Sequence, residues 1–412
     1  MFVDEGRKAG AIGRVRRLVA ERRPGHSLDR AFYVDPDIYD LELERIIYRN
    51  WFLAGHVSEW SAPGDFRRFD VADESALIVR GDDGELRAFA NVCRHRGSRV
   101  CLESTGSARQ FSCPYHGWQY GLDGTLTAAR AMPDDFDAGA HGLKPVALDI
   151  VHGLVFVAFS AAPPPLDSAR RDLEQPMSWF GFESMCVAHR QCYEFPASWK
   201  LASEHYLEWY HCATARKSYA ARHTLMLPSR QRRRVQAGML ARLEAAGLEE
   251  FVIDRIDTRA PAGETGYGYS RTALFDGYLT GSRDGQPLAP LLGSLKDFDG
   301  GGSDFTFGAF SFMLAYSDHV VAYVFYPLAH DKAGLDVLWL VNGNAVEGKD
   351  YDRDALTWLW HETTLEDLKI IRDNWLGVRS RFYEPGPFSG MERAESVYVD
   401  WLLAELLRED AP

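Results

Sequence analysis

The chain has 412 residues, of which 46% are hydrophobic and 25% are charged, the balance of an ordinary globular protein. That length is enough for two or three domains with a sizeable core. A net charge of -13 argues against nucleic acid or an anionic membrane as the main partner. The sequence contains no apolar run of about eighteen residues, so it predicts no membrane-spanning segment. Four of the six cysteines lack the regular spacing of a disulfide framework, which predicts a reducing, cytoplasmic environment; they are Cys101, Cys186, Cys192 and Cys212.

Residues 1–48 are predicted to form a helical segment that packs on the last domain. The arginine-rich stretch at 14–23 has some features of a transit peptide, but acidic residues lie beside it and no cleavage-like site follows. A solvated helix is therefore the better interpretation. A Pro-Gly turn at 24–25 separates this helix from a short one expected over 41–48.

Residues 49–162 change to short β-rich runs, separated by turn signals such as Asp-Gly. This pattern predicts a small antiparallel β domain. A proline-rich linker at 163–165 follows it.

Two short motifs in the β-rich region carry metal-binding side chains. Cys93-x-His95 and Cys113-x-x-His116 each supply one thiolate and one imidazole. Two thiolates suit one iron of a [2Fe–2S] cluster and two imidazoles suit the other, which is the ligand set of a Rieske centre. A structural zinc ion accepts the same ligand types and is the alternative. Glycine, proline, tyrosine and tryptophan crowd both motifs, which argues against a chance match.

Residues 170–412 are predicted to form a larger domain that combines an antiparallel sheet with long helices. Helices are expected over 199–211, 351–378 and 391–407, and β-forming runs that pair as hairpins occupy 305–326 and 335–341. With the β domain, the predicted fold class is α+β.

These motifs resemble the α subunits of Rieske non-haem iron oxygenases over nearly the whole chain. The segment Glu208-x-Tyr210-His211 resembles that family's catalytic-iron helix, and Asp367 matches its carboxylate ligand. The resemblance implies a Rieske domain and a helix-grip catalytic domain, assembled as a head-to-tail trimer. It also implies a [2Fe–2S] cluster on the two β-domain motifs and a mononuclear Fe(II) on His211 and Asp367.

The implied reaction is hydroxylation or demethylation of a small aromatic or quaternary ammonium substrate by dioxygen, with electrons from NAD(P)H through a reductase or ferredoxin. A facial triad of two histidines and one carboxylate leaves open positions on Fe(II) for dioxygen. The family's electron route runs from a cluster histidine of one protomer to an iron histidine of its neighbour. Glu208 is the implied bridge on this route, and it is expected to project from the same helix face as His211, three residues later.

The sequence departs from the family at residue 216. The family's second iron histidine lies five residues after the first, and this chain has Arg216 there. Arginine stays protonated and offers only hydrogen-bond donors, so it cannot bind Fe(II).

Three explanations are open. Arg216 abolishes the iron site, for example by pairing with Asp367 or Glu208; another histidine substitutes; or the residue was replaced deliberately. Loss of the site would make the chain a catalytically silent Rieske subunit, passing electrons to an intact homologous partner in a hetero-oligomer.

Two other histidines lie near enough in the sequence to be considered as substitutes. His205 is six residues before His211 and is expected to face away from it on a continuous helix. His223 is twelve residues after His211 and could return to the site only if the chain bends.

Overall fold

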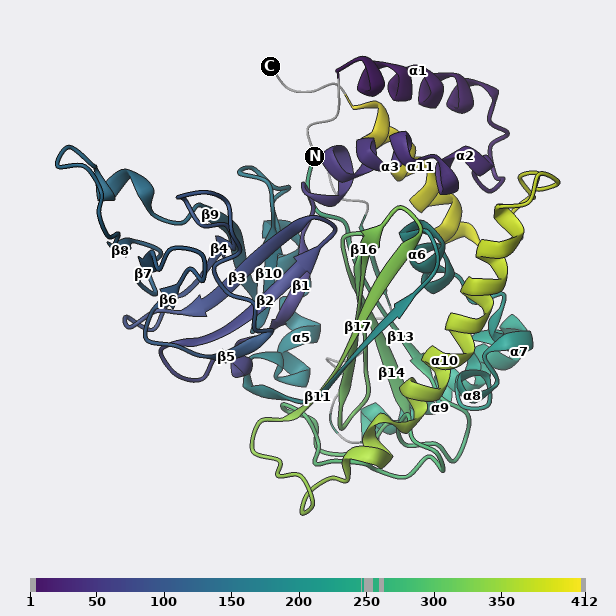
Figure 1. Cartoon of the computed structure of the whole chain (residues 1–412). Helices are drawn as coiled ribbons and strands as arrows, with labels where there is room; N and C mark the ends of the chain where they lie inside the picture. The colour runs from purple at the N-terminus through teal and green to yellow at the C-terminus, as the bar shows by residue number, and fades with distance from the viewer. Residues whose placement is uncertain (1–4, 246, 248–254, 259–262, 409–412) are drawn as a thin grey trace.

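The computed structural model describes residues 5–245, 247, 255–258 and 263–408. Its parts are a helical N-terminal segment, a β-rich domain, and an antiparallel sheet with long helices (Figure 1). This architecture confirms the predicted α+β fold class. Residues 1–4 and 409–412, which belong to the predicted first and last segments, lie outside the described residues.

The N-terminal segment is helical but is divided differently from the prediction. Its elements are α1 (Glu5–Glu21), α2 (Arg30–Val34), α3 (Pro36–Glu42) and the π-helical turn η1 (Leu43–Ile47). α3 starts earlier than the predicted helix because the Asp35 side chain accepts a hydrogen bond from the Asp37 N–H at 2.9 Å and proline follows the cap. Buried Glu42 then ties this segment to the catalytic domain through Lys200 Nζ at 2.5 Å.

The β-rich domain contains a seven-stranded antiparallel sheet of order β1-β10-β9-β4-β3-β2-β5 and a small sheet of order β6-β7-β8. The strands are β1 (Phe52–His56), β2 (Asp65–Val71), β3 (Glu74–Arg80), β4 (Leu86–Ala90), β5 (Thr105–Ser107), β6 (Phe111–Ser112), β7 (Gln119–Tyr120), β8 (Leu126–Ala128), β9 (Pro145–Val151) and β10 (Leu154–Ala158). The first Cys/His motif follows β4, and the second lies between β6 and β7.

The catalytic domain is built on a second seven-stranded antiparallel sheet. Its strands are β11 (Met185–Phe195), β12 (Arg255–Thr258), β13 (Tyr267–Ala273), β14 (Gly301–Phe307), β15 (Ser311–Ala315), β16 (Val320–Ala329) and β17 (Lys332–Asn342). β12 to β17 pair in chain order, and β11 joins the edge beside β17. The predicted β run over 305–326 therefore folds back on itself as parts of three strands, while β16 and β17 form the expected hairpin.

The remaining helices are α4 (Asp167–Asp172), α5 (Glu174–Phe180), α6 (Trp199–Leu207), α7 (Cys212–Ala215), α8 (Lys217–Ala220), α9 (Ser229–Ala245), α10 (Arg353–Val378) and α11 (Arg393–Leu407), with short turns η2 (Val57–Glu59), η3 (Ala138–His141), η4 (Phe182–Ser184) and η5 (Thr224–Met226). α6 packs on β16 and β17, and α10 packs on both α6 and β11 (Figure 1). The Tyr323 hydroxyl hydrogen-bonds with Thr364 Oγ1 at 2.8 Å, which fixes α10 against the sheet one turn before Asp367.

Two further predictions can be compared with the fold. In the described part of the chain, no helix is both long and apolar enough to cross a membrane. None of the six cysteines forms a disulfide bond, in agreement with the predicted lack of a disulfide framework. The cytoplasmic location stays a prediction.

Candidate cluster and iron sites

The first Cys/His loop closes on itself through its backbone. The Gly97 N–H donates to the Cys93 carbonyl at 2.9 Å, and the Cys93 N–H donates to the Ser98 carbonyl at 2.8 Å. Gly97 has a φ of +79°, which glycine adopts without the steric cost that other residues meet. This turn holds Cys93 and His95 in a defined orientation.

The second loop is built in the same way. The Gly117 N–H donates to the Cys113 carbonyl at 3.0 Å, the Cys113 N–H donates to the Trp118 carbonyl at 2.8 Å, and Gly117 has a φ of +73°. Both cysteines are therefore held by the same kind of tight turn.

The two loops bring all four predicted ligands together. Cys93 and Cys113 are 3% and 2% exposed, whereas His95 and His116 lie farther out, with their Nδ1 atoms 3.1 Å apart. Trp118 stacks on His95 with ring centroids 4.8 Å apart and shields one side. Buried thiols and outer imidazoles fit a cluster with one iron on each ligand pair, which would supply one-electron transfer.

Tyr120 contacts the cluster position directly. Its hydroxyl accepts a hydrogen bond from the Arg94 N–H at 3.0 Å and lies 3.3 Å from Cys93 Sγ. Because the oxygen already accepts from Arg94, its own proton points to the sulfur. Hydrogen bonds to ligand sulfurs are one of the factors that set the reduction potential of such clusters.

Replacing Tyr120 by phenylalanine is therefore expected to lower the reduction potential of the cluster, since the reduced form loses a hydrogen bond that stabilises its extra negative charge. A redox titration followed by EPR measures this. Tyr115→Phe is the control, because that ring is 54% exposed and its hydroxyl makes no hydrogen bond within the described residues. Equal potentials for the two variants would contradict the expectation.

The predicted catalytic helix over 199–211 is interrupted. α6 ends at Leu207, and Glu208 has an extended backbone with φ −124° and ψ 158°. The Glu208 carboxylate accepts hydrogen bonds from the N–H groups of Tyr210 and His211, the second at 3.2 Å, and hydrogen-bonds His211 Nδ1 at 2.5 Å. Glu208 and His211 therefore meet as expected, but through a turn; their predicted placement on one helix face is wrong.

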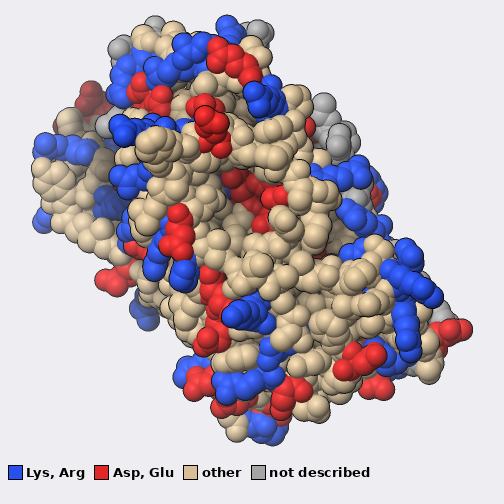
Figure 2. Space-filling view, turned by 90° about the vertical axis from the view of Figure 1, so that its right-hand side faces the viewer, with Lys and Arg blue, Asp and Glu red and all other residues tan. Residues whose placement is uncertain are grey.

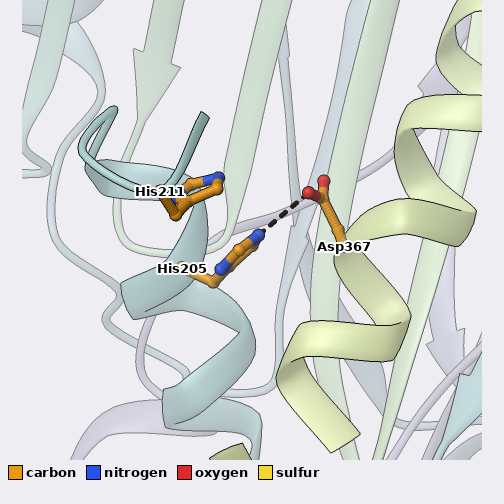
Figure 3. A group of neighbouring side chains, drawn as sticks. All are labelled: His205, His211 and Asp367. Atoms are coloured by element: carbon orange, nitrogen blue, oxygen red, sulfur yellow. Dashed lines mark hydrogen bonds and ion pairs between the residues drawn. The ribbon is translucent and has the colours of Figure 1, made fainter. Parts of the chain in front are cut away.

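The same turn changes the position of His205. The chain doubles back after α6, so the rings of His205 and His211 lie with centroids 3.9 Å apart. His205 Nε2 is 2.9 Å from Asp367 Oδ1 on α10, and ligand atoms of all three residues lie within 4.8 Å of one another (Figure 3). The expectation that His205 faces away is wrong because it assumed a continuous helix.

Arg216 lies beside these three residues and is bound to one of them. It is 1% exposed, and its Nε and Nη2 lie 3.0 and 2.6 Å from Asp367 Oδ2. This confirms the predicted pairing with Asp367. Burial disfavours the charged form of both side chains. The charge of Asp367 acts against burial and raises the pKa of Arg216. The charge of Arg216, and to a smaller extent that of His205, lowers the pKa of Asp367.

His223 is committed elsewhere. One ring nitrogen hydrogen-bonds the Tyr219 carbonyl at 3.0 Å and the other hydrogen-bonds the Tyr316 hydroxyl at 2.7 Å. Its ring also stacks on Tyr219 at 3.7 Å, and burial lowers its pKa to about 3. With both nitrogens occupied, His223 has no free ligand atom.

Among the described residues, His205, His211 and Asp367 form the group that suits a single metal ion. Burial lowers the pKa of His211, against the effect of Glu208, which favours the neutral imidazole that binds metals. Two imidazoles and a carboxylate fit Fe(II), which would supply open positions for dioxygen.

Comparison with known proteins identifies the family of both domains. The family described as Rieske [2Fe-2S] domain matches residues 50–146, and the family described as ring hydroxylating alpha subunit (catalytic domain) matches residues 281–406. The chain is 32% identical over 392 residues to the glycine betaine monooxygenase oxygenase subunit of Chromohalobacter salexigens, covering 93% of this chain and 86% of that protein. The chain belongs to the Rieske non-haem iron oxygenase α-subunit family.

Two further proteins are similar to this oxygenase subunit. It is 33% identical over 198 residues to the carnitine monooxygenase oxygenase subunit of Acinetobacter pittii, covering 46% of this chain and 53% of that protein. A crystal structure of a quaternary ammonium Rieske monooxygenase shares the fold, with a TM-score of 0.72, 21% identity, and coverage of 93% of this chain and 96% of that chain. Family membership implies the predicted cofactors, a Rieske cluster and a mononuclear iron. The catalytic-family match begins at residue 281, after the segment that carries His205 and Arg216.

Sequence reasoning missed one acidic residue beside the iron site. Asp304 on β14 interacts electrostatically with Arg216 and with Tyr206 of α6. The available signal was a lone carboxylate directly before the β-forming run that begins at Phe305.

Proposed function

We propose that this oxygenase subunit hydroxylates a methyl group of a small quaternary ammonium compound. One atom of dioxygen enters the carbon–hydrogen bond and the other leaves as water, with two electrons supplied through a reductase and two protons taken from solvent. The hydroxymethyl ammonium product then releases formaldehyde and a proton and leaves the tertiary amine, so the net result is demethylation. This proposal rests on the 32% sequence identity to a glycine betaine monooxygenase oxygenase subunit, which extends over 93% of the chain.

Asp304 supports a cationic substrate. It lies among the aromatic side chains of Tyr206, Tyr219 and Tyr316. Burial is the main cause that raises the pKa values of these tyrosines, and the charge of Asp304 is the second. The Asp304 side chain keeps some accessible surface, and no described residue donates a hydrogen bond to it. An unpaired carboxylate beside aromatic rings is suited to a quaternary ammonium ion, which cannot donate hydrogen bonds and binds through charge and cation–π contacts.

The face that carries α10 is hollowed near its centre, and acidic side chains lie at the floor of the hollow (Figure 2). A negative cleft raises the local concentration of cations and so favours their entry over that of anions.

The Asp304→Asn variant is expected to bind glycine betaine ~10–100-fold more weakly, because the attraction between two unit charges ~6–10 Å apart contributes ~1.7–2.8 kcal/mol at an effective dielectric constant of about 20. Burial raises the pKa of Asp304 to about 7, against the effect of Arg216. Protonation below that pH removes its charge, so wild-type affinity should rise as the pH increases through about 7, while the variant should show no such rise. Isothermal titration calorimetry at several pH values measures both effects.

The matched control ligand is 3,3-dimethylbutanoate, which has the same shape as glycine betaine but carries carbon in place of the ammonium nitrogen. Its affinity should be unchanged or improved by Asp304→Asn. An equal loss for both ligands would mean that Asp304 shapes the cavity rather than binds the cation. The other titratable groups that face Asp304 are Arg216, which is paired with Asp367, and tyrosines. The pKa values of these tyrosines are raised, so they do not titrate near pH 7.

We also propose that electrons reach the iron from the cluster of a neighbouring protomer in a head-to-tail trimer. The β6-β7-β8 sheet and α10 lie on opposite sides of the molecule, so a route within one chain crosses the whole catalytic sheet (Figure 1). Exposed apolar side chains flank both centres: Val92 and Tyr115 adjoin cluster ligands, and Tyr210 adjoins His211. Apolar exposure at both ends of the route supports contact between protomers there.

A second candidate function is that of a silent subunit, because Arg216 stands in the position of the family's second iron histidine and is paired with Asp367. In that case the chain would deliver electrons from its cluster to an intact partner and perform no oxygen chemistry itself. The two functions differ in whether this chain binds a mononuclear iron.

A further inference from the structure

The position where the family carries its second iron histidine is closed to the metal in this chain. Arg216 is fully buried there, and its guanidinium is held at 2.6–3.0 Å by Asp367 Oδ2. The arginine has neither a lone pair nor the freedom to leave its buried counterion. Any iron bound here therefore needs a ligand from another residue.

His205 reaches the position where such a ligand is required. It belongs to the last turn of α6, and the break after Leu207 brings His211 back beside it. The three ligand atoms that converge come from α6, from the turn before α7, and from α10 (Figure 3). Two imidazoles and one carboxylate on one side of a metal leave the other side open for dioxygen and substrate.

The two oxygens of Asp367 have separate partners. Oδ2 faces Arg216, whereas Oδ1 faces His205 Nε2 at 2.9 Å. The arginine therefore occupies one oxygen and leaves the other for a metal, so Asp367 would bind as a one-oxygen ligand. Glu208 likewise holds His211 Nδ1, so Nε2, whose contact with Cys212 Sγ is a long one of 3.7 Å, is the atom left to bind a metal, a common arrangement for metal-binding histidines.

We propose that His205, His211 and Asp367 form the mononuclear iron site of this chain, and that Arg216 is a positioning residue that fixes the carboxylate. The missing histidine is replaced from the preceding helix rather than lost. The positive charge of Arg216 is offset by Asp367, and Glu208 adds a negative charge on the far side of His211. This inference goes beyond the substrate proposal and does not depend on it, because metal binding is measured without substrate.

The test is iron analysis of the purified chain after anaerobic loading with Fe(II) and desalting. About three irons per chain are expected, two in the cluster and one in the triad. His205→Ala should retain about two, with an unchanged Rieske EPR spectrum and without the ferrous nitrosyl EPR signal that nitric oxide produces at a mononuclear site. His361→Ala is the matched control: this histidine is also on the domain's helices but hydrogen-bonds Tyr193 at 2.8 Å, so it should retain about three.

Two results would overturn the proposal. One is about two irons per wild-type chain with a full Rieske spectrum; the other is an unchanged third iron in His205→Ala. If that variant does not fold, His205→Asn keeps the polar contact with Asp367 and takes its place.

Arg216→His gives an independent outcome. A relocated site predicts about three irons both with and without this change, whereas a rise from about two to about three would show that Arg216 had abolished the site. Failure of the substrate proposal would leave all these iron counts unaffected.

Discussion

Glutamine in place of Glu208 is expected to lower product formation about 100-fold while both metal centres stay loaded. The carboxylate hydrogen-bonds His211 Nδ1 at 2.5 Å and accepts the His211 N–H at 3.2 Å. Glutamine keeps an oxygen within reach of Nδ1, so the orientation of the imidazole is preserved. It removes the negative charge that stabilises His211 and that would link it to a cluster histidine of the neighbouring protomer.

The measurement is a single turnover that starts from reduced clusters, followed by their absorbance after mixing with substrate and dioxygen. Cluster reoxidation in Glu208→Gln should slow in parallel with product formation, and the iron content should not change. Glu366→Gln is the control, because Glu366 is adjacent to Asp367 but hydrogen-bonds Ser218 instead of the site histidines. Reoxidation at the wild-type rate would exclude the bridging role, and loss of iron would show that Glu208 only supports His211.

Alanine in place of Asp367 is expected to remove the mononuclear iron and to lower the free energy of unfolding of the catalytic domain by about 3–5 kcal/mol. The change removes a ligand atom and also leaves the Arg216 guanidinium buried without its counterion. Both side chains of the ion pair are almost inaccessible to water, at 1% and 8% exposure, so solvent cannot take the place of the carboxylate. Activity in the hydroxylation assay should be lost with the iron.

The double variant Asp367→Ala/Arg216→Met separates the two effects. It removes both charges, so most of the lost stability should return while the iron stays absent. Denaturant unfolding monitored by far-ultraviolet circular dichroism, together with iron analysis, gives the two readouts. Equal destabilisation in the single and double variants would mean that lost packing, and not the uncompensated arginine, accounts for the effect.

The fold was predictable to different extents in its two domains. The β domain and the helices α10 and α11 follow from local patterns, since turn residues, alternation and caps act over a few residues. The boundaries of α6 did not follow. Its helical periodicity continues through residues 199–211 with no glycine or proline to mark an end, but the chain leaves the helix at Glu208, where the carboxylate binds the backbone of Tyr210 and His211.

The sequence by itself determined the cluster site, because each of its loops places a cysteine and a histidine within four residues. Such short spacings define geometry locally, and the glycines at 97 and 117 with positive φ complete each turn. Family resemblance also identified Glu208, His211 and Asp367 as residues of one site.

Only the tertiary structure decided how the iron site is assembled. His205 and Asp367 are 162 residues apart in the chain and meet because α10 packs on α6. Whether Arg216 blocks the metal or positions its carboxylate depends on which oxygen of Asp367 it binds, and no spacing of residues contains that information. In the sequence, the arginine at position 216 indicated only that an iron ligand is missing. In the structure, α6 ends at Leu207 and α10 packs on α6, which brings His205 to the position of the missing ligand.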